Sequence, residues 1–242
     1  MSVKKTRLDH LLVQKQLVPT RSQAESYIRL GEVQVNDRVI KKPGYFVAGD
    51  AKIEFGAKEQ YVSRAALKLA SVAATLDLDF NGKTVLDVGS STGGFTDYAL
   101  QHGASKVIAV DVGTNQLHPR LRQDNRVAVY EKTDIREFKT DTKADIAVID
   151  VSFISMTKVL KSVAQLIKKD AQIVAMLKPQ FEAGKEQLNK GVVKNSAQRR
   201  EILQKFELWC RENSFVILKK SDSAVAGEKG NLERFYLLKY SK

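Results

Sequence analysis

Three carboxylates in this sequence follow hydrophobic stretches at points where strands are expected to end. Asp87 lies in KTVLDV, Asp111 lies in KVIAVDV, and Asp134 comes shortly after VAVYEK. In an open parallel sheet, ligands bind outside the carboxyl ends of the strands. A carboxylate after the second strand is placed to accept from both ribose hydroxyls, and one after the third to accept from an adenine amino group. The spacing therefore predicts a nucleoside site.

The loop GSSTGGF, which follows the first of these strands, indicates the kind of nucleoside. It has no lysine after its glycines, as a Walker phosphate loop requires, and its glycine spacing differs from G-x-G-x-x-G. Carboxylates repel phosphates but suit a sulfonium and an α-amino group, so we expect S-adenosylmethionine as the cofactor. The alternative is a doubly wound domain whose small residues only form caps and turns. The expected cofactor-binding residues in this part of the chain are Asp87, Gly89, Ser91, Gly93, Gly94, Phe95, Asp111 and Asp134.

These residues need a parallel sheet to bring them together, and the chain from residue 63 onward predicts one. Strand-like runs alternate with amphipathic segments from SRAALKLASVAATL to QIVAMLK, which is typical of right-handed βαβ units. A helix, SAQRREILQKFELWCRE, and two strands, SFVILKKSD and RFYLLKY, complete the domain. The predicted fold class of residues 63–242 is α/β, a Rossmann-like domain with a mostly parallel seven-stranded sheet.

Residues 1–55 predict a separate, small α+β domain. Two short helices are expected in RLDHLLVQKQL and TRSQAESYIRLG, the second with Thr20 and Gln23 in capping-box positions and Gly31 as its stop signal. Strand-like runs separated by ND, PG and GD turns follow. The short polar segment 56–62 is the expected linker between the two domains.

Charge and cysteine content narrow the class of protein. The 242 residues include 40 Lys and Arg against 28 Asp and Glu, a net charge of +12 that favours a polyanionic partner. No apolar run reaches the roughly 18 residues of a membrane helix, and the basic N-terminus lacks the apolar core of a signal peptide. One cysteine and three isolated histidines have no metal-ligand spacing. We expect a cytoplasmic protein without a metal site or stable membrane association.

The N-terminal pattern R-L-D-x-x-L-V, followed by T-R-S-Q-A-x-x-Y-I-R-x-G-x-V-x-V-N, resembles a known RNA-binding fold. That fold is shared by a ribosomal protein, pseudouridine synthases and tyrosyl-tRNA synthetases, and its second helix presents basic residues to the RNA backbone. The resemblance implies an RNA-facing surface on this domain. Its expected residues are Arg7, Arg21, Ser22, Arg29 and Lys41.

An ordered set of motifs over nearly the whole chain resembles the TlyA family of FtsJ-type RNA 2′-O-methyltransferases, which are often named hemolysins. The motifs are SRAALKL, LDVGSSTGGFTDYAL, VIAVDVGTNQL, DVSFISM, LKPQFE, KGVVK and GNLERF. The resemblance implies S-adenosylmethionine as methyl donor and a cytidine ribose of ribosomal RNA as acceptor, in the large subunit and in some members also the small. The short end of the chain favours the large subunit within this family.

The same resemblance implies a catalytic set of Lys68, Asp150, Lys178 and Glu233. A ribose hydroxyl is a poor nucleophile unless its proton is removed or its developing charge is stabilised. A lysine held by carboxylates can do either, according to its protonation state. We expect Lys178 to contact the hydroxyl, and Asp150 to orient it and to lie near the bound cofactor. Lys68 and Glu233 are expected to position the ribose.

Some alternatives stay open on sequence alone. Phe153 and Phe181 flank these motifs, and either stacking on a base or ordinary packing explains them. A membrane-lytic protein is disfavoured because the chain has no membrane span and no strongly amphipathic cationic helix. A non-catalytic RNA-binding protein is disfavoured by the intact four-residue set. Ribosomal RNA or ribosomal subunits are the expected partners, and the sequence predicts no oligomeric state.

Overall fold

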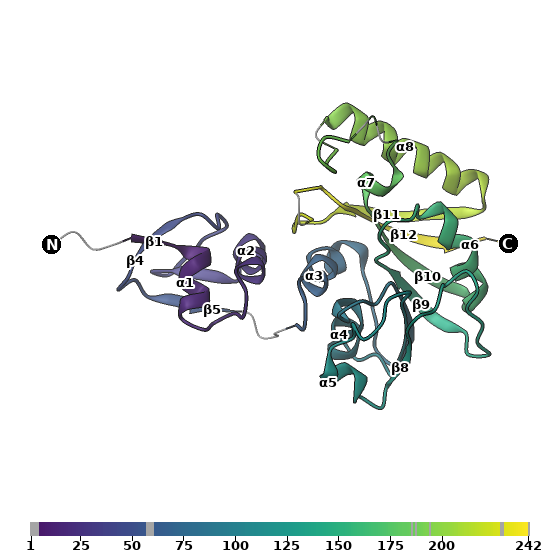
Figure 1. Ribbon diagram of the computed structural model, residues 1–242, viewed down its shortest axis with the longest axis horizontal. Coiled ribbons are helices and arrows are strands. Elements are labelled where there is room, and N and C mark those ends of the chain that lie inside the picture. Colours follow the sequence, from purple (N-terminus) through teal and green to yellow (C-terminus); the bar gives the residue numbers. More distant parts are fainter. Residues whose placement is uncertain are drawn as a thin grey trace.

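The computed structural model describes residues 5–56, 61–184, 186, 188–193, 195–227 and 230–241. Most of the expected linker, residues 56–62, therefore lies outside the described residues. A small N-terminal body is followed along the chain by a larger C-terminal one (Figure 1). No helix in the described ranges is both long enough and apolar enough to cross a membrane.

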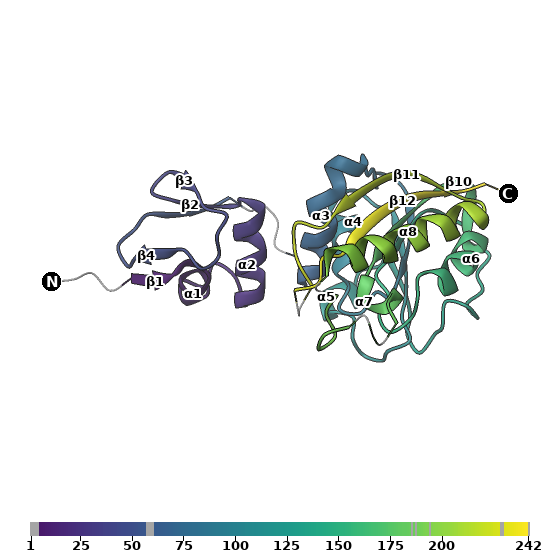
Figure 2. The ribbon, with the colours of Figure 1, turned by 90° about the horizontal axis from the view of Figure 1, so that it is seen from above.

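The N-terminal body packs two helices against short strands (Figure 2). Its two sheets have the strand orders β1-β4 and β3-β2-β5. The elements are β1 (Lys5–Arg7), α1 (Leu8–Gln14), α2 (Arg21–Leu30), β2 (Val33–Val35), β3 (Arg38–Val39), β4 (Phe46–Ala48) and β5 (Ile53–Phe55). Strand β1, which pairs with β4, was not predicted, because a run of three residues is too short to show an alternating pattern.

Helix α2 begins and ends where its capping signals predict. The Thr20 hydroxyl accepts a hydrogen bond from the Gln23 amide at 3.2 Å, and Gly31 follows the last turn with a φ of 85°. Glycine suits this left-handed conformation because it has no Cβ. The Gln23 side chain also bonds to the N-cap residue, because its Oε1 accepts from the Thr20 hydroxyl at 3.1 Å, although a full capping box would use the Thr20 amide. Its amide nitrogen donates to the Tyr61 carbonyl, 3.2 Å away at the start of the larger body.

The larger body is built on a seven-stranded sheet of order β11-β12-β10-β9-β6-β7-β8. Its strands are β6 (Thr84–Val88), β7 (Lys106–Val110), β8 (Val127–Tyr130), β9 (Ala144–Ile149), β10 (Ile167–Leu177), β11 (Phe215–Asp222) and β12 (Arg234–Tyr240). The pairs from β10 through β8 are parallel, and β12 pairs antiparallel with both β10 and β11. The predicted α/β fold with a mostly parallel seven-stranded sheet is confirmed.

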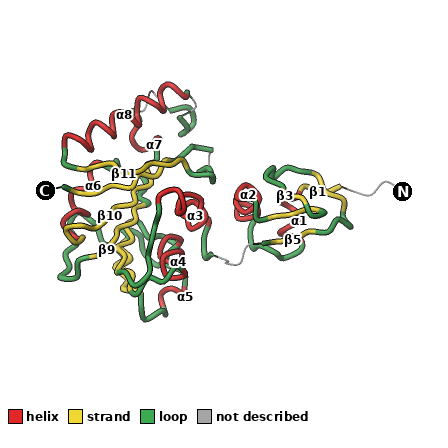
Figure 3. Tube along the Cα trace, turned by 180° about the vertical axis from the view of Figure 1, so that it is seen from behind, coloured by secondary structure: helices red, strands yellow, loops and turns green. Residues whose placement is uncertain are grey.

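Helices cover both faces of this sheet (Figures 1 and 3). Successive strand residues point to opposite faces, so Leu86 joins one hydrophobic cluster and Val85 joins the other. The helices are α6 (Thr157–Leu166) and α8 (Ser196–Glu212) on the first face, and α3 (Arg64–Leu76), α4 (Gly94–Gln101) and α5 (Pro119–Arg122) on the second. A short helix, α7 (Pro179–Glu182), follows β10. The loops after the parallel strands therefore meet along one edge of the sheet.

The two bodies contact each other through α2, α3 and the loop between β11 and β12. Leu67 of α3 and Val225 of that loop are each 2% exposed and belong to the hydrophobic cluster of the N-terminal body. The Arg64 guanidinium donates to the Ser22 hydroxyl at 2.6 Å. Helix α3 and the β11–β12 loop are thus held by the N-terminal body as well as by the sheet.

Candidate active site

The loop after β6 passes close to the loop after β9, and a glycine permits this approach. Gly89 has a φ of 80°, and a Cβ there would lie 2.7 Å from the Asp150 carbonyl oxygen. The Gly89 amide donates to the Val110 carbonyl, and the Asp150 amide donates to the Val88 carbonyl, both at 2.9 Å. The ends of β6, β7 and β9 are therefore joined by hydrogen bonds into one rim.

A cavity of about 520 Å³ lies along this rim, and we call it the cofactor cavity. The Asp111 carboxylate accepts from the Ser91 amide at 2.8 Å and from the Gly113 amide at 2.6 Å. These bonds fix the carboxylate and leave its remaining lone pairs for a ligand. The expected cofactor residues that line the cavity are Gly89, Ser91, Asp111, Asp134 and Asp150.

Asp134 lies in the cofactor cavity, but its carboxylate already has a partner. The Arg136 guanidinium is 2.5 Å from Oδ2, and the Arg136 amide donates to Oδ1 at 2.9 Å. These contacts lower the pKa of the Asp134 carboxyl. A ligand amino group that bonds to Asp134 has to share the carboxylate with Arg136.

Asp87 differs from the other two carboxylates because it is fully buried. The Thr96 hydroxyl donates to Oδ2 at 2.6 Å, whereas Oδ1 has no hydrogen-bond partner among the described residues. Burial raises the pKa of the Asp87 carboxyl to about 7, and the nearby Asp150 carboxylate adds to the rise. Asp87 lines a small cavity, and its unpaired oxygen would gain the missing bond from a cationic ammonium group bound there. The donor set therefore fits the α-amino group of S-adenosylmethionine.

The last three residues of the expected cofactor loop have a clear part in packing. A Cβ on Gly93 would lie 2.3 Å from the Leu121 side chain, and a Cβ on Gly94 would lie 2.3 Å from Ser63 Oγ. Phe95 is 2% exposed and packs in the cluster between the sheet and α3. Gly94 and Phe95 also border the small cavity beside Asp87, whereas Gly93 lines none of the cavities described here.

The four residues of the expected catalytic set lie together as two lysine–carboxylate pairs. Lys68 Nζ is 2.6 Å from Glu233 Oε2, and Lys178 Nζ is 2.5 Å from Asp150 Oδ1. The side chains come from α3, from the chain just before β12, and from the ends of β10 and β9. Lys68, Lys178 and Glu233 line a groove of about 670 Å³, which we call the substrate groove.

A junction cavity of about 150 Å³ lies between the cofactor cavity and the substrate groove. Its lining includes Asp87, Gly89, Asp150 and Lys178. The Lys178 amine also donates to the Ser152 hydroxyl at 2.8 Å. Asp150 and Lys178 therefore lie where a bound methyl donor and a substrate in the groove would meet.

The Lys68–Glu233 pair is almost completely shielded from solvent. Glu233 is 2% exposed, and burial raises the pKa of its carboxyl, while the positive charge of Lys68 opposes that rise. Neither Glu233 Oε2 nor Asp150 Oδ1 has well-aligned hydrogen-bond geometry, so both lysine contacts are primarily ionic. A Cβ on Gly227 would lie 2.9 Å from Glu233 Oε1, so the glycine leaves room for this carboxylate.

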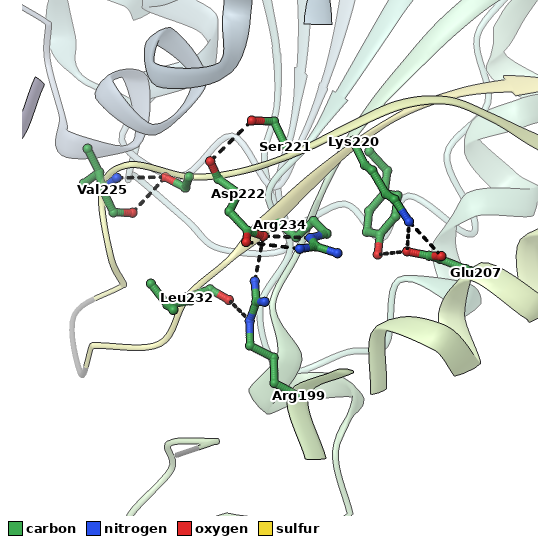
Figure 4. Close-up of polar contacts among 10 residues, drawn as sticks. Arg199, Glu207, Lys220, Ser221, Asp222, Val225, Leu232 and Arg234 are labelled. Atoms are coloured by element: carbon green, nitrogen blue, oxygen red, sulfur yellow. Dashed lines mark hydrogen bonds and ion pairs between the residues drawn. The ribbon is translucent and has the colours of Figure 1, made fainter. Parts of the chain in front are cut away.

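Polar contacts brace the chain on both sides of Glu233 (Figure 4). The Asp222 carboxylate accepts from Arg199 Nη2 and from Arg234 Nε, each at 2.7 Å. Arg199 also donates to the Leu232 carbonyl at 3.1 Å. Helix α8 is thereby tied to the end of β11 and to both residues next to Glu233.

Phe153 occupies an unusual position at the rim of the site. Its side chain is 91% exposed, and its φ of 65° is strained for a bulky residue. Its ring centroid lies 5.0 Å from that of Phe181, and both rings line the substrate groove. Packing into a core therefore does not explain Phe153, whereas Phe181 is partly buried.

The expected RNA-binding arginines of the N-terminal body have an internal partner. Arg7 Nη2 and Arg21 Nε lie 2.7 Å and 2.9 Å from Asp9 Oδ2, and Asp9 is fully buried. Burial alone would raise the pKa of this carboxyl, but the two arginines lower it to about 2. Arg7 and Arg21 therefore stabilise the fold as well as lying at the surface.

The other expected RNA-binding residues do not contact the Asp9 carboxylate. Arg29 and Lys41 are exposed, and neither forms an ion pair with a described residue. The Lys41 side chain lies beside Gly31, where α2 ends. Ser22 is exposed at the start of α2, but its hydroxyl accepts the hydrogen bond from Arg64. Arg29 and Lys41 are thus the members of this set with no structural partner in the described chain.

Sequence reasoning missed residues that hold the site in shape. The Asn231 side chain is 5% exposed, donates to the Gly191 carbonyl at 3.0 Å and accepts from the Val193 amide at 3.1 Å. Glu182 accepts from Ser155 Oγ at 2.6 Å and fixes the loop after β9. Both residues lie in the quoted motifs, but their partners are tens of residues away, so no local pattern signals these roles.

Two protein families match the chain. The match to the FtsJ-like methyltransferases covers residues 61–240, and the match to the S4 domain covers residues 6–53. A 23S rRNA (cytidine-2′-O)-methyltransferase of Campylobacter jejuni is 39% identical over 74% of this chain and 70% of its own length. A 16S/23S rRNA (cytidine-2′-O)-methyltransferase of Mycobacterium tuberculosis is 34% identical over 98% of this chain and 90% of its own length.

Solved structures resemble the whole chain or its larger body. A Streptococcus thermophilus protein, named as a proposed hemolysin, has a TM-score of 0.74 at 37% identity and covers 100% of this chain and 90% of its own. A Listeria monocytogenes protein, named as a proposed S-adenosylmethionine-dependent methyltransferase, has a TM-score of 0.53 at 19% identity. It covers 72% of this chain and 99% of its own, and that likeness concerns the fold alone.

Proposed function

Because this chain belongs to the FtsJ-like methyltransferase family and carries an S4 domain, we propose that it methylates the 2′-hydroxyl of a cytidine ribose in ribosomal RNA. The observation that carries the proposal is the position of Asp150 and Lys178 between the cofactor cavity and the substrate groove. Of the two rRNA methyltransferases compared above, both are named for 23S rRNA and one also for 16S rRNA, so the proposal takes the large subunit as a substrate and the small subunit as a second candidate.

The carboxylates along the rim bind the methyl donor. S-adenosylmethionine, when bound, supplies a methyl group activated by its sulfonium sulfur. Asp111 holds the ribose hydroxyls, Asp134 accepts from the adenine amino group, and Asp87 accepts from the α-amino group. This assignment is supported by their places in the cofactor and junction cavities and by the unpaired Asp87 oxygen.

Lys178 acts on the ribose hydroxyl. A neutral amine takes the proton that the hydroxyl loses, and an ammonium stabilises the negative charge that develops on the oxygen. Asp150 orients the amine in either case. The buried Lys68–Glu233 pair also lines the groove and positions the ribose.

The two bodies divide the work of binding RNA and transferring the methyl group. Residues 1–55 hold the RNA, residues 63–242 perform the transfer, and the partner is a ribosomal subunit or its RNA in the cytoplasm. Sequence-specific contacts need an exposed or flipped nucleotide, because the A-form major groove is too narrow for side chains. The exposed Phe153 ring at the groove rim is placed to stack on such a base.

Methyl transfer to isolated subunits tests the proposal. Purified protein with labelled S-adenosylmethionine is expected to label large subunits from cells that lack this gene, and 2′-O-methyl mapping is expected to place the label on a cytidine. Lys178→Ala is expected to abolish labelling without weakening cofactor binding. Asp111→Ala is expected to weaken cofactor affinity about tenfold or more, as the loss of a charged hydrogen bond implies.

Three results would contradict parts of this proposal. Full methyl transfer by Lys178→Ala would contradict the catalytic role of Lys178. Unchanged cofactor affinity in Asp111→Ala would contradict the role of Asp111 in holding the cofactor ribose. Label in small subunits alone would show that the large subunit is the wrong substrate. Asp124→Ala is a matched control for Asp111, because Asp124 also accepts from a nearby amide but lies outside the three cavities.

A further inference from the structure

Ser152 is the one described residue that lines the cofactor cavity, the junction cavity and the substrate groove. It is exposed, so the hydrophobic core does not account for its position. Its hydroxyl accepts a hydrogen bond from Lys178 Nζ at 2.8 Å. Resting on the proposed function, we propose that Ser152 is a positioning residue that fixes how the Lys178 amine faces the ribose hydroxyl.

The need for a second partner follows from the shape of a lysine amine. The terminal nitrogen has three positions for hydrogens or a lone pair, and it rotates freely about its bond to the last carbon. The ion pair with Asp150 Oδ1 at 2.5 Å holds the nitrogen in place, but it is not an aligned hydrogen bond and so does not fix the rotation of the amine. The hydrogen bond to Ser152 Oγ fixes this rotation, and with it the directions of the other two positions. Because Lys178 lines the groove, a substrate hydroxyl there can use one of them.

The loop that carries Ser152 is held at both ends. The Asp150 amide donates to the Val88 carbonyl at 2.9 Å, and Glu182 accepts from the Met156 amide at 2.7 Å. Between these anchors, Phe153 has the strained φ of 65°. Strain of this kind persists only where the surrounding structure enforces it. Ser152 therefore reaches Lys178 from a prearranged backbone, which suits a residue that positions another.

The test compares Ser152→Ala with Ser152→Thr and with Ser105→Ala in the full-length protein. Ser105 is a matched control, because its hydroxyl donates to the Gly82 carbonyl at 3.0 Å and lines none of the three cavities. For methyl transfer to large subunits, Ser152→Ala is expected to lower kcat about tenfold. The KM for the subunit and the affinity for S-adenosylmethionine are expected to stay within twofold of wild type. Ser152→Thr, which keeps the hydroxyl, is expected to restore kcat.

Two outcomes in the variants would overturn the inference. One is a Ser152→Ala enzyme whose kcat matches that of Ser105→Ala. The other is a loss of activity with weaker cofactor affinity that Ser152→Thr does not restore, which would mean that Ser152 only shapes the cavity. Failure of the proposed function looks different, because the wild-type enzyme itself would then label no subunit, and both proposals would fall.

Discussion

At the scale of single residues, the partners of two buried aspartates give their carboxyls opposite pKa shifts. Asp87 and Asp9 are both fully buried. Asp9 is held by two arginines, and its pKa falls to about 2, whereas Asp87 has one hydroxyl partner and its pKa rises to about 7. A buried carboxylate is costly unless cations or several donors compensate it. Asp9 therefore stabilises the fold through its two ion pairs, whereas the Asp87 carboxyl has no cationic partner among the described residues.

This difference predicts how the stability of Asp87→Asn depends on pH. In wild type the unfolded chain loses the Asp87 proton near pH 3.8, whereas the folded protein keeps it up to about pH 7. The stability that this proton contributes is full below pH 3.8 and is lost as the pH rises through 7. Asparagine does not titrate, and its carbonyl can still accept from Thr96. We subtract the melting temperature of wild type from that of Asp87→Asn at each pH. This difference is therefore expected to increase from pH 5 to pH 8.

Thermal unfolding followed by circular dichroism at several pH values measures this trend. Asp124→Asn is the control, because the pKa of Asp124 is lowered by its bond to Arg126, so no such increase is expected. A constant offset between Asp87→Asn and wild type over this pH range would mean that Asp87 does not hold a proton in the folded state.

At the scale of elements, patterns of hydrophobicity and capping predicted most of the fold. The alternation of strands and helices predicted the seven-stranded sheet, and the Thr20 and Gly31 signals marked the ends of α2. The three-residue strand β1 carried too little pattern to be recognised. The side chain of Gln23 bonds to Thr20 at the cap and also to a carbonyl 38 residues away, and the second contact depends on how the two bodies meet.

The candidate site was predictable to a similar degree and for the same reasons. Residues at strand ends, such as Asp111, follow from the position of the strand, and the lysine–carboxylate pairs were expected from family motifs. The residues that hold them, such as Asn231 and Ser152, depend on contacts between distant loops. The packing role of Gly94 was also hidden, because it depends on how closely α4 approaches α3.

That close approach predicts the effect of Gly94→Ala. An added Cβ would lie 2.3 Å from Ser63 Oγ and 2.8 Å from the Ala66 amide nitrogen, at the start of the helix that carries Lys68. Overpacking of this kind costs about 1–3 kcal/mol, so the free energy of unfolding is expected to fall by that amount. Because α3 must shift, methyl transfer is expected to fall as well. Denaturant unfolding and activity assays measure the two effects.

Gly49→Ala provides the matched control for this glycine. A Cβ on Gly49 meets nothing within 4 Å, and its φ is not positive, so little change in stability is expected. If Gly94→Ala were as stable and as active as Gly49→Ala, the contact between α3 and α4 would not constrain the site.

At the scale of the whole molecule, the N-terminal body meets the two segments that supply the Lys68–Glu233 pair. Leu67 precedes Lys68 on α3, and Val225 lies in the β11–β12 loop that leads to Glu233. Both side chains are buried in the cluster of the N-terminal body. The surface expected to bind RNA is therefore connected by direct packing to the segments that form one side of the substrate groove.

The arginines of that surface provide the final prediction, because their structural roles differ. Arg29 is exposed and has no ion-pair partner among the described residues, whereas Arg21 contacts the buried Asp9 carboxylate at 2.9 Å. Arg29→Ala is expected to weaken RNA binding and to reduce the slope of log affinity against log salt by about one, with an unchanged melting temperature. Arg21→Ala is expected to weaken RNA binding and also to lower the melting temperature at pH 7, because the Asp9 carboxylate loses a donor. Filter binding over a range of salt concentrations and thermal unfolding measure both effects, with the exposed Arg211 of α8 replaced by Ala as control. Equal salt slopes in Arg29→Ala, Arg211→Ala and wild type would show that α2 does not face the RNA backbone.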